Sequence, residues 1–302
     1  MTSKASTVNN NFVAQWRDYL ELCKPRVVAL MVFTALVGML IAAPGNVPFD
    51  ALIFGLLGIT LMAGSAAAIN HLVDRNADAL MRRTRNRPLP SGQLDARSCL
   101  IFAFTIGTAG MLLLILFVNT LTAVLTLVSL VGYAVIYTMF LKRATPQNIV
   151  IGGAAGAMPP MLGWTAVTGQ VDPGALLLFL IIFTWTPPHF WALALYRKEE
   201  YAKTGIPMLP LTHGDDYTRL QIALYAVLLV VVSVLPFVTG MSGVVYLAGV
   251  LVLDAIFLFY VVMLFVSRQR KWAIKTFFYS IVYLTILFAI LLFDRYLPLA
   301  MT

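Results

Sequence analysis

The stretch that decides the fold is AAAINHLVDRNADALMRRTRNRPLPSG, residues 66–92, which closes a long apolar segment. Within it, Asn70, Asp74 and Asp78 recur at every fourth position. Helical residues i, i+4 and i+8 lie on one face of a helix. The pattern therefore predicts a helix that carries one amide and two carboxylates on one face, at the edge of a membrane span.

An arginine cluster follows these acids, formed by Arg82, Arg83, Arg85 and Arg87. Carboxylates bind Mg²⁺, Mg²⁺ binds phosphate oxygens, and arginines bind the phosphate oxygens that remain. Beside a bilayer, this combination predicts a site for a diphosphate with a lipid tail. The alternative is a solvated helix end with acid–base pairs, but three aligned polar residues and an arginine cluster exceed what helix solubility requires.

Composition places the chain in a membrane. Of its 302 residues, 60% are hydrophobic and only 11% are charged, whereas soluble domains carry about 25% charged residues. A helix needs about 20 apolar residues to span a bilayer. Nine apolar runs approach that length, at residues 27–43, 51–69, 98–118, 121–141, 149–167, 174–195, 220–240, 244–266 and 276–293. The sequence therefore predicts an all-α membrane protein whose nine transmembrane helices form one domain, residues 27–297, after a tail, residues 1–26.

The basic residues follow the predicted connections between spans. The net charge is +8, and all but one of the 21 lysines and arginines lie in the tail or in every second connection. The positive-inside rule then predicts a cytoplasmic N-terminus and a C-terminus outside. Because the charges follow membrane topology, no nucleic-acid partner is expected. The tail lacks the apolar core and cleavage site of a signal peptide, so we expect a short amphipathic helix on the inner membrane surface.

A second acidic patch lies in the other long cytoplasmic connection, residues 196–219. Glu199 and Glu200 follow the sixth predicted span, with Arg197 and Lys198 beside them. Acidic patches at the ends of two spans predict Mg²⁺ ions on either side of a diphosphate. The alternative is a surface loop of mixed charge.

His189 lies inside the sixth predicted span, six residues before its cytoplasmic end. Six residues at 1.5 Å each place it at a depth of roughly 9 Å. Pro187 and Pro188 are expected to break this helix, and Pro159 and Pro160 to break the fifth span. An ionisable residue at that depth predicts a function, such as donating a hydrogen bond, shuttling a proton or ligating a haem iron. The alternative is a histidine satisfied by a neighbouring carbonyl.

Other unusual residues inside the spans have two interpretations each. Gly152, Gly153, Gly156 and Gly163 in the fifth span predict close helix packing first and cavity shaping second. Asp254 lies near the centre of the eighth span and must face protein or water. A structural hydrogen bond and a substrate contact both remain open for it.

These motifs resemble the UbiA superfamily of intramembrane prenyltransferases. NHLVDRNADALMRRTRNRPLPSG is similar to the first aspartate-rich motif of that family, and nine spans with acidic cytoplasmic loops match its architecture. RTRNRPLPSG, TPPHFWALAL and EEYAKTGIPMLPLTHG together resemble the branch of the family that uses haem. The resemblance covers residues 24–292.

The resemblance implies a UbiA-like bundle with an active site that faces the cytoplasm. The enzyme would be Mg²⁺-dependent and would transfer a farnesyl group from farnesyl diphosphate to the vinyl group of haem b, which is a substrate rather than a cofactor. The product, haem o, serves terminal oxidases, so haem a synthase or oxidase assembly factors would be partners. The location implied is the inner membrane of a bacterium, as a multi-pass protein in the lipid bilayer.

The resemblance also implies roles for individual residues. Asn70, Asp74 and Asp78 match the first motif, whereas the second motif, usually two aspartates four apart, reads Tyr196 and Glu200 here. His189 is similar to the histidine expected to contact haem. The catalytic residues would be Asn70, Asp74, Asp78 and Glu200, and the metal ligands Asp74, Asp78, Glu199 and Glu200. The diphosphate would be bound by Arg82, Arg83, Arg85, Arg87, Lys142, Arg143 and Lys198.

Two other functions compete with this prediction. A related prenyltransferase would use the same site with an aromatic acid as acceptor, but His189 and the missing second aspartate pair argue against it. A transporter would place polar groups near the middle of several spans, where only Asp254 lies. A lipid-anchored scaffold without chemistry is a third, more distant alternative.

Overall fold

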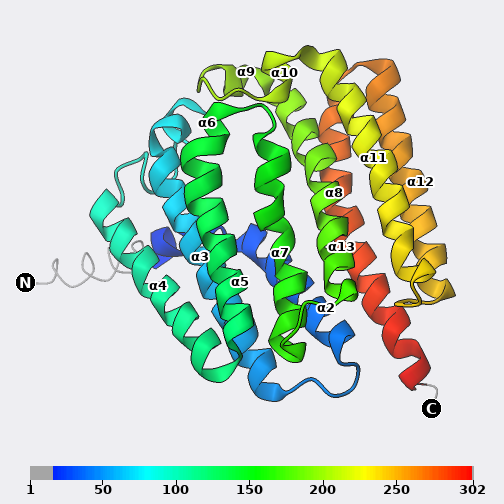
Figure 1. Ribbon diagram of the computed structural model, residues 1–302. Helices are drawn as coiled ribbons and strands as arrows, with labels where there is room; N and C mark the ends of the chain where they lie inside the picture. Colours follow the sequence, from blue (N-terminus) through cyan, green and yellow to red (C-terminus); the bar gives the residue numbers. More distant parts are fainter. Residues whose placement is uncertain (1–15, 301–302) are drawn as a thin grey trace, which may run out of the picture.

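The computed structural model describes the backbone of residues 16–300 and the side chains of residues 16–297 (Figure 1). This part of the chain has no strand, and 9 of its helical segments are long and apolar enough to cross a membrane, which confirms the predicted number of spans. They are α2 (Pro25–Ala42), α3 (Phe49–Leu80), α4 (Ala96–Phe117), Thr120–Ala144, α7 (Asn148–Thr168), α8 (Pro173–Tyr196), α11 (Gly214–Val238), α12 (Val244–Ser267) and α13 (Arg270–Ala300). Residues 16–22 form a short helix before α2, and the rest of the predicted tail helix region, residues 1–15, lies outside the described residues.

Local sequence signals set several helix ends. Asp95 precedes α4, and its side chain accepts a hydrogen bond from the Ser98 backbone N–H at 3.0 Å. Asn119 accepts one from the Thr122 N–H at 2.8 Å in the same way. Such caps satisfy backbone donors that have no partner within the helix, and each contributes about 1 kcal/mol. Gly169 ends α7 in the left-handed conformation (φ 67°), which costs glycine little.

The two proline pairs do not break their helices, which corrects the expectation from the sequence. α7 runs through Pro159 and Pro160, and α8 runs through Pro187 and Pro188. All four prolines are buried, so packing outweighs an intrinsic cost of about 3 kcal/mol for each interior proline. Neighbouring helices and hydroxyl groups satisfy the backbone groups that proline leaves unpaired in membrane helices. As a result α8 is one continuous helix, and it carries His189 at a fixed position.

Glycines let α2 and α7 approach closely. A Cβ atom on Gly163 would overlap the Ala35 carbonyl oxygen, and one on Gly38 would overlap the Pro160 carbonyl oxygen. The predicted packing role is therefore confirmed for Gly163. Gly156 has open space beside it and lines a cavity instead, which is the second role that the sequence predicts for these glycines.

Asp254 forms a structural hydrogen-bond cluster in the C-terminal part of the bundle. It accepts hydrogen bonds from the Ser233 hydroxyl at 2.8 Å and the Tyr283 hydroxyl at 2.7 Å. The three residues come from α12, α11 and α13 and are buried. This arrangement satisfies a polar group inside the membrane and joins three helices, which confirms the structural hydrogen bond considered for Asp254.

The two long connections lie at the same end of the bundle. Figure 1 shows α9 (Lys198–Ala202) and α10 (Leu209–Thr212) at the top of the view, together with the connection between α3 and α4. α8 packs against α7, α11 and α13, so it links the two sides of the bundle. The polar connections thus meet at one end, and its cytoplasmic orientation stays a prediction of the positive-inside rule.

Candidate active site

The first acidic patch is a hydrogen-bonded network on α3. Asn70 Nδ2 donates to Asp74 Oδ2 at 2.8 Å, as the spacing of the two residues predicts. The Lys24 ammonium donates to Asn70 Oδ1 at 2.5 Å, and the Lys142 ammonium donates to Asp74 Oδ2 at 2.6 Å. Asn70 and Asp74 are both buried. Of the neighbours Lys142 and Arg143, the structure therefore brings Lys142 to the acid.

Asp78 lies one turn further along α3 and pairs with Arg87. Arg87 Nη1 lies 2.6 Å from Asp78 Oδ2, and both side chains are largely buried. The Thr84 hydroxyl donates to the Asp78 backbone carbonyl at 2.9 Å, so the chain after α3 folds back over the acid. Among the described residues, Arg87 is the one member of the predicted arginine cluster that forms an ion pair with the first patch.

Lys24 is a site residue that the sequence pattern does not identify. It directly precedes α2 and has a left-handed backbone (φ 50°, ψ 59°), which costs a non-glycine residue roughly 1–2 kcal/mol. Burial foremost, and then the charge of Arg87, lowers the pKa of Lys24 to about 8. The only signal in the sequence is a lysine directly before Pro25 at the start of the first span.

A π-helix positions Lys142 and Thr138. The fourth span consists of α5 (Thr120–Val131), η1 (Gly132–Leu141) and α6 (Lys142–Ala144), and η1 is the π-helix. Thr138 Oγ1 accepts a hydrogen bond from Asn70 Nδ2 at 3.2 Å and donates to the Tyr133 carbonyl at 2.7 Å. π-helical turns are rare and often occur at functional sites. The residues of η1 read as an ordinary apolar span, so the sequence gives no sign of this turn.

The second acidic patch lies in a surface hollow lined by Arg82, Arg83, Tyr196, Arg197, Glu199, Glu200 and Arg270. Arg197 Nη1 is 2.5 Å from Glu200 Oε1, and Arg270 Nη2 is 2.8 Å from Glu199 Oε1. The Glu200 side chain is 25% exposed, whereas that of Glu199 is 80% exposed. Glu200 is therefore the better placed of the two to act on a bound substrate.

Tyr201 lies between the two patches and is buried. Burial raises the pKa of its hydroxyl, and the charges of Arg83, Arg197, Glu200 and Asp74 also act on it. Charges from α3 and from both connections therefore act on the same phenol. An aromatic residue in a charged connection is a weak signal, and sequence reasoning misses it.

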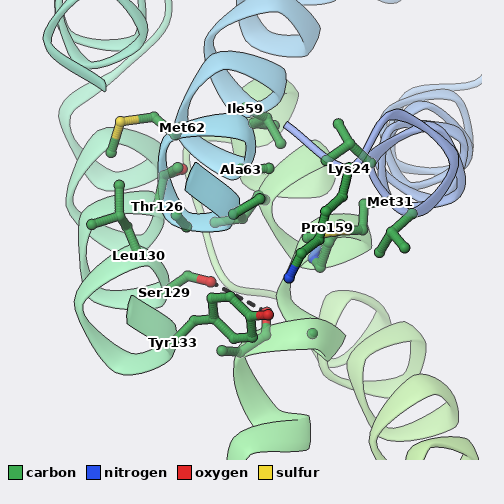
Figure 2. Close-up of a pocket in the computed structure, with 17 residues that line it drawn as sticks. Lys24, Met31, Ile59, Met62, Ala63, Thr126, Ser129, Leu130, Tyr133 and Pro159 are labelled. Atoms are coloured by element: carbon green, nitrogen blue, oxygen red, sulfur yellow. Dashed lines mark hydrogen bonds between the residues drawn. The ribbon is translucent and has the colours of Figure 1, made fainter. Parts of the chain in front are cut away.

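An apolar cavity extends from this polar end into the membrane part of the bundle. Its volume is about 150 Å³. It is lined by Lys24, Val27, Val28, Met31, Ile59, Met62, Ala63, Ala66, Ala67, Thr126, Ser129, Leu130, Tyr133, Ala155, Gly156, Pro159 and Leu162. Figure 2 shows the Lys24 side chain extending toward the end of the cavity where Tyr133 lies. The apolar cavity thus reaches the ammonium group of Lys24, which belongs to the first patch.

His189 has well-defined neighbours inside the bundle. Its ring stacks on Trp185 and on Phe277, with ring centroids 4.2 Å and 4.6 Å apart. Its Nδ1 lies 2.6 Å from the hydroxyl oxygen of Ser280. The hydrogen-bond partners of His189 are therefore the Ser280 hydroxyl of α13 and the Phe277 backbone carbonyl, so the neighbouring carbonyl considered from the sequence is present as well.

The carboxylates fit Mg²⁺ that arrives with a diphosphate. In residues 16–297, no group of three or more His, Cys, Asp or Glu side chains is arranged to hold a metal ion. Asp74 Oδ1 and Glu200 Oε2 are buried and have no hydrogen-bond partner among these residues. Mg²⁺ is usually bound by one or two carboxylates, water and substrate phosphates rather than by an all-protein cage. Unpaired carboxylate oxygens beside lysines and arginines match that mode of binding.

Three residues predicted to bind diphosphate lie elsewhere. Lys198 pairs with Asp215 at 2.6 Å, and Arg85 and Arg143 are exposed. Within the described part of the chain, no ion pair joins any of the three to the acids of either patch.

Comparison with known proteins supports a prenyltransferase fold. Residues 31–282 match the model of the UbiA prenyltransferase family. The chain is 58% identical over 297 residues to the protoheme IX farnesyltransferase of Hahella chejuensis, which covers 98% of this chain and 99% of the relative. It is 62% identical over 281 residues to the protoheme IX farnesyltransferase of Marinobacter nauticus, which covers 93% of each chain.

Solved structures show the same fold at low sequence identity. A digeranylgeranylglyceryl phosphate synthase has a TM-score of 0.78 at 20% identity and covers 93% of this chain and 98% of its own. A UbiA homolog from Archaeoglobus fulgidus, bound to GPP and Mg²⁺, has a TM-score of 0.66 at 17% identity and covers 91% and 99%.

Proposed function

Because the chain belongs to the UbiA prenyltransferase family, we propose that it transfers the farnesyl group of farnesyl diphosphate to the vinyl group of haem b. The observation that carries this proposal is identity of 58% over 98% of the chain to a protoheme IX farnesyltransferase. The product is haem o, and the class of partner that consumes it is the machinery that equips terminal oxidases with haem.

The diphosphate binds beside the first acidic patch. Lys24, Lys142 and Arg87 already point their cationic groups at Asn70, Asp74 and Asp78, and they donate to diphosphate oxygens when the substrate is present. Arg82 and Arg83, which line the hollow, are further candidate donors. Fixed cations at the leaving group stabilise the charge that develops as the carbon–oxygen bond breaks.

Mg²⁺ held by Asp74, Asp78 and Glu200, with Glu199 as a further candidate, would supply additional neutralisation of the diphosphate. Asn70 orients Asp74 through its amide at 2.8 Å. The other carboxylate oxygen of Asp74, Oδ1, is buried and has no hydrogen-bond partner among the described residues. This free oxygen supports a role in metal binding.

The farnesyl chain occupies the apolar cavity that begins at Lys24. Its walls come from α2, α3, α5, η1 and α7 and consist mainly of apolar groups. An apolar chamber excludes water from an allylic cation, which would otherwise be hydrolysed. The chain therefore binds with its reactive carbon at the polar end of the cavity, where the diphosphate is held.

The proposed reaction is an addition to the haem vinyl group. The bond between C1 of farnesyl and the diphosphate oxygen breaks, and C1 forms a bond to the terminal vinyl carbon. Water then adds to the other vinyl carbon and loses one proton, which leaves a hydroxyl group there. His189 contacts the haem and fixes the position of the vinyl group.

We further propose in which membrane, and in which orientation, the protein carries out this reaction. The chain forms one nine-helix domain, residues 27–297, in the inner membrane of a bacterium, with the site facing the cytoplasm. The described part of the tail, residues 16–26, lies on the inner surface. Haem a synthase or oxidase assembly factors receive the product.

A mass spectrum of haem tests this function. Purified protein is mixed with haem b, farnesyl diphosphate and Mg²⁺, with and without a chelator, and the haem is extracted. We expect Mg²⁺-dependent conversion to a species heavier by one farnesyl group and one hydroxyl group. Unchanged haem, with prenylation of an aromatic acid in a parallel reaction, would assign the chain a different acceptor.

A further inference from the structure

The Ser280 hydroxyl has one proton and two short contacts. Its oxygen lies 2.7 Å from the Phe277 carbonyl oxygen and 2.6 Å from His189 Nδ1. A carbonyl oxygen can only accept, so the single hydroxyl proton belongs to that contact. His189 Nδ1 must therefore donate its proton to the Ser280 oxygen. In a neutral imidazole the other nitrogen, Nε2, is then left with a free lone pair.

Three residues, Trp185, Phe277 and Ser280, hold the imidazole ring of His189 in place. The rings of Trp185 and Phe277 each stack on the imidazole ring, with interplanar angles of 17° and 25°. Trp185 Nε1 donates to the Ser280 backbone carbonyl at 2.7 Å. Two residues of α8 and two of α13 thus fix one another, so the ring cannot turn without breaking contacts between these helices.

His189 lies below the hollow that contains the second acidic patch. Tyr196 follows His189 by seven residues on α8, and Arg270 precedes Phe277 by seven residues on α13. Seven residues correspond to about two helical turns, or roughly 10 Å. Tyr196 and Arg270 both line the hollow. The imidazole is therefore about two turns beneath the hollow, on the helix faces that reach it.

The free nitrogen of this histidine is available to a ligand. His189 is partly exposed, and its hydrogen-bond partners in the described part of the chain are the Ser280 hydroxyl, beside Nδ1, and the neighbouring Phe277 backbone carbonyl. The guanidinium groups of Arg197 and Arg270 in the hollow above it suit carboxylates, which haem carries as propionates. A haem with its propionates in the hollow would place its iron toward His189.

We propose that Ser280 is a positioning residue that fixes the Nδ1–H tautomer of His189 and so presents Nε2 to the iron of the haem substrate. This inference rests on the proposed function for the identity of its ligand. Metal-bound histidines commonly donate their second ring N–H to a fixed acceptor, which orients the ring and raises its basicity. Loss of such an acceptor costs about 10–100-fold in affinity for the metal.

The test is a titration of the full-length protein with haem b, without farnesyl diphosphate, followed by resonance Raman spectroscopy of the reduced complex. His189→Ala is expected to remove the iron–histidine stretching band. Ser280→Ala is expected to weaken haem binding about 10–100-fold and to lower the frequency of that band. Ser280→Thr, which keeps the hydroxyl, is expected to restore both. Ser280→Cys, a weaker acceptor of similar size, provides a second variant if Ser280→Ala does not fold.

The matched control is Ser233→Ala. It also removes a buried hydroxyl that bonds to a side chain of another helix, Asp254, so it should leave haem affinity and the band unchanged. Wild-type affinity and frequency in Ser280→Ala would overturn the positioning role, as would an unchanged band in His189→Ala. Conversion of haem by the wild-type protein is measured separately, so a failed inference with intact turnover is distinguishable from a failed function.

Discussion

Individual ion pairs neutralise the acidic residues of this site before any substrate is bound. Asp74 and Asp78 each pair with a cation, Lys142 and Arg87, in a largely buried setting. Removing one partner of such a pair leaves an uncompensated charge and costs about 3–5 kcal/mol. Substitutions that keep size and polarity are therefore better tests of binding at this site than truncation to alanine.

The pKa of Lys24, which burial and Arg87 lower to about 8, predicts that diphosphate binding weakens in alkaline solution. Below that pH the ammonium is charged and donates to the diphosphate, and above it the charge is lost. A lysine in water would keep its charge up to about pH 10. We expect the KM for farnesyl diphosphate to rise between about pH 7 and 9, and Lys24→Arg to move that rise to higher pH. Steady-state kinetics across this range measure it, and a flat wild-type profile would contradict the role of Lys24.

Arg87 and Arg85 form a matched pair for testing which arginines bind the diphosphate. Arg87 pairs with Asp78, whereas Arg85 is exposed. Hydrogen bonds to charged groups contribute about 1.5–3 kcal/mol, so Arg87→Gln should raise the KM for farnesyl diphosphate about 10–100-fold. Arg85→Gln should change it less than about threefold, as expected for an exposed charge. Equal increases in KM for the two variants would contradict the assignment of Arg87, rather than Arg85, to the diphosphate.

The spacing of Asn70, Asp74 and Asp78 was enough to predict a shared helix face, because i,i+4 geometry is local. The choice between Lys142 and Arg143 could not be predicted, because it depends on the π-helix η1. Lys24 and Tyr201 could not be predicted either. Their places in the site come from contacts between segments far apart in the chain.

Whole helices, rather than single side chains, form the chamber beneath the charged end. α7 is central to it, because Gly163 allows contact with α2 and Gly156 leaves space open in the cavity. The sequence showed both glycines but could not assign the two roles, since these depend on which face of α7 meets α2. The prolines of α7 and α8 were misjudged for a related reason: burial between helices outweighs the local tendency to break.

Gly163→Ala is expected to destabilise the protein. Alanine favours a helix by about 1 kcal/mol over glycine, but its Cβ would overlap the Ala35 carbonyl oxygen, and overpacking costs about 1–3 kcal/mol. The thermal unfolding temperature in detergent should fall. Gly156→Ala, where nothing lies within 4 Å, is the control and should keep or raise it; the reverse order would contradict close packing of α2 on α7.

Gly156→Leu is expected to shorten the prenyl chain that the protein accepts. Its side chain would enter the apolar cavity from α7, so the longer farnesyl chain loses space before the shorter geranyl chain does. The ratio of kcat/KM for farnesyl over geranyl diphosphate should fall at least about tenfold, a loss of 1.4 kcal/mol in transition-state binding. An unchanged ratio would mean that the chain binds elsewhere.

The whole molecule is an integral membrane protein with its two acidic patches at one end. Both long connections lie at that end (Figure 1), above an apolar cavity within the bundle. Hydropathy and the distribution of basic residues predicted the number of spans and the connections that carry chemistry. They could not predict how the connection after α3 folds, which sends Arg87 to the first patch and Arg82 and Arg83 to the hollow beside the second. That fold depends on contacts such as those of Thr84 and Arg87 with Asp78.

The most direct measurement is the rate of haem conversion, followed by mass spectrometry, in Asp74→Asn beside Asp216→Asn. Asn at position 74 keeps the size and a hydrogen-bonding oxygen but loses the charge needed to bind Mg²⁺ with the diphosphate. Asp216 is exposed and pairs with Arg219 at 2.8 Å, so its variant controls for the loss of one carboxylate. Asp74→Asn should convert haem at least about 100-fold more slowly than the wild type, while Asp216→Asn converts it at the wild-type rate. Full conversion by folded Asp74→Asn would contradict the assignment of the first acidic patch as the place where the diphosphate is activated.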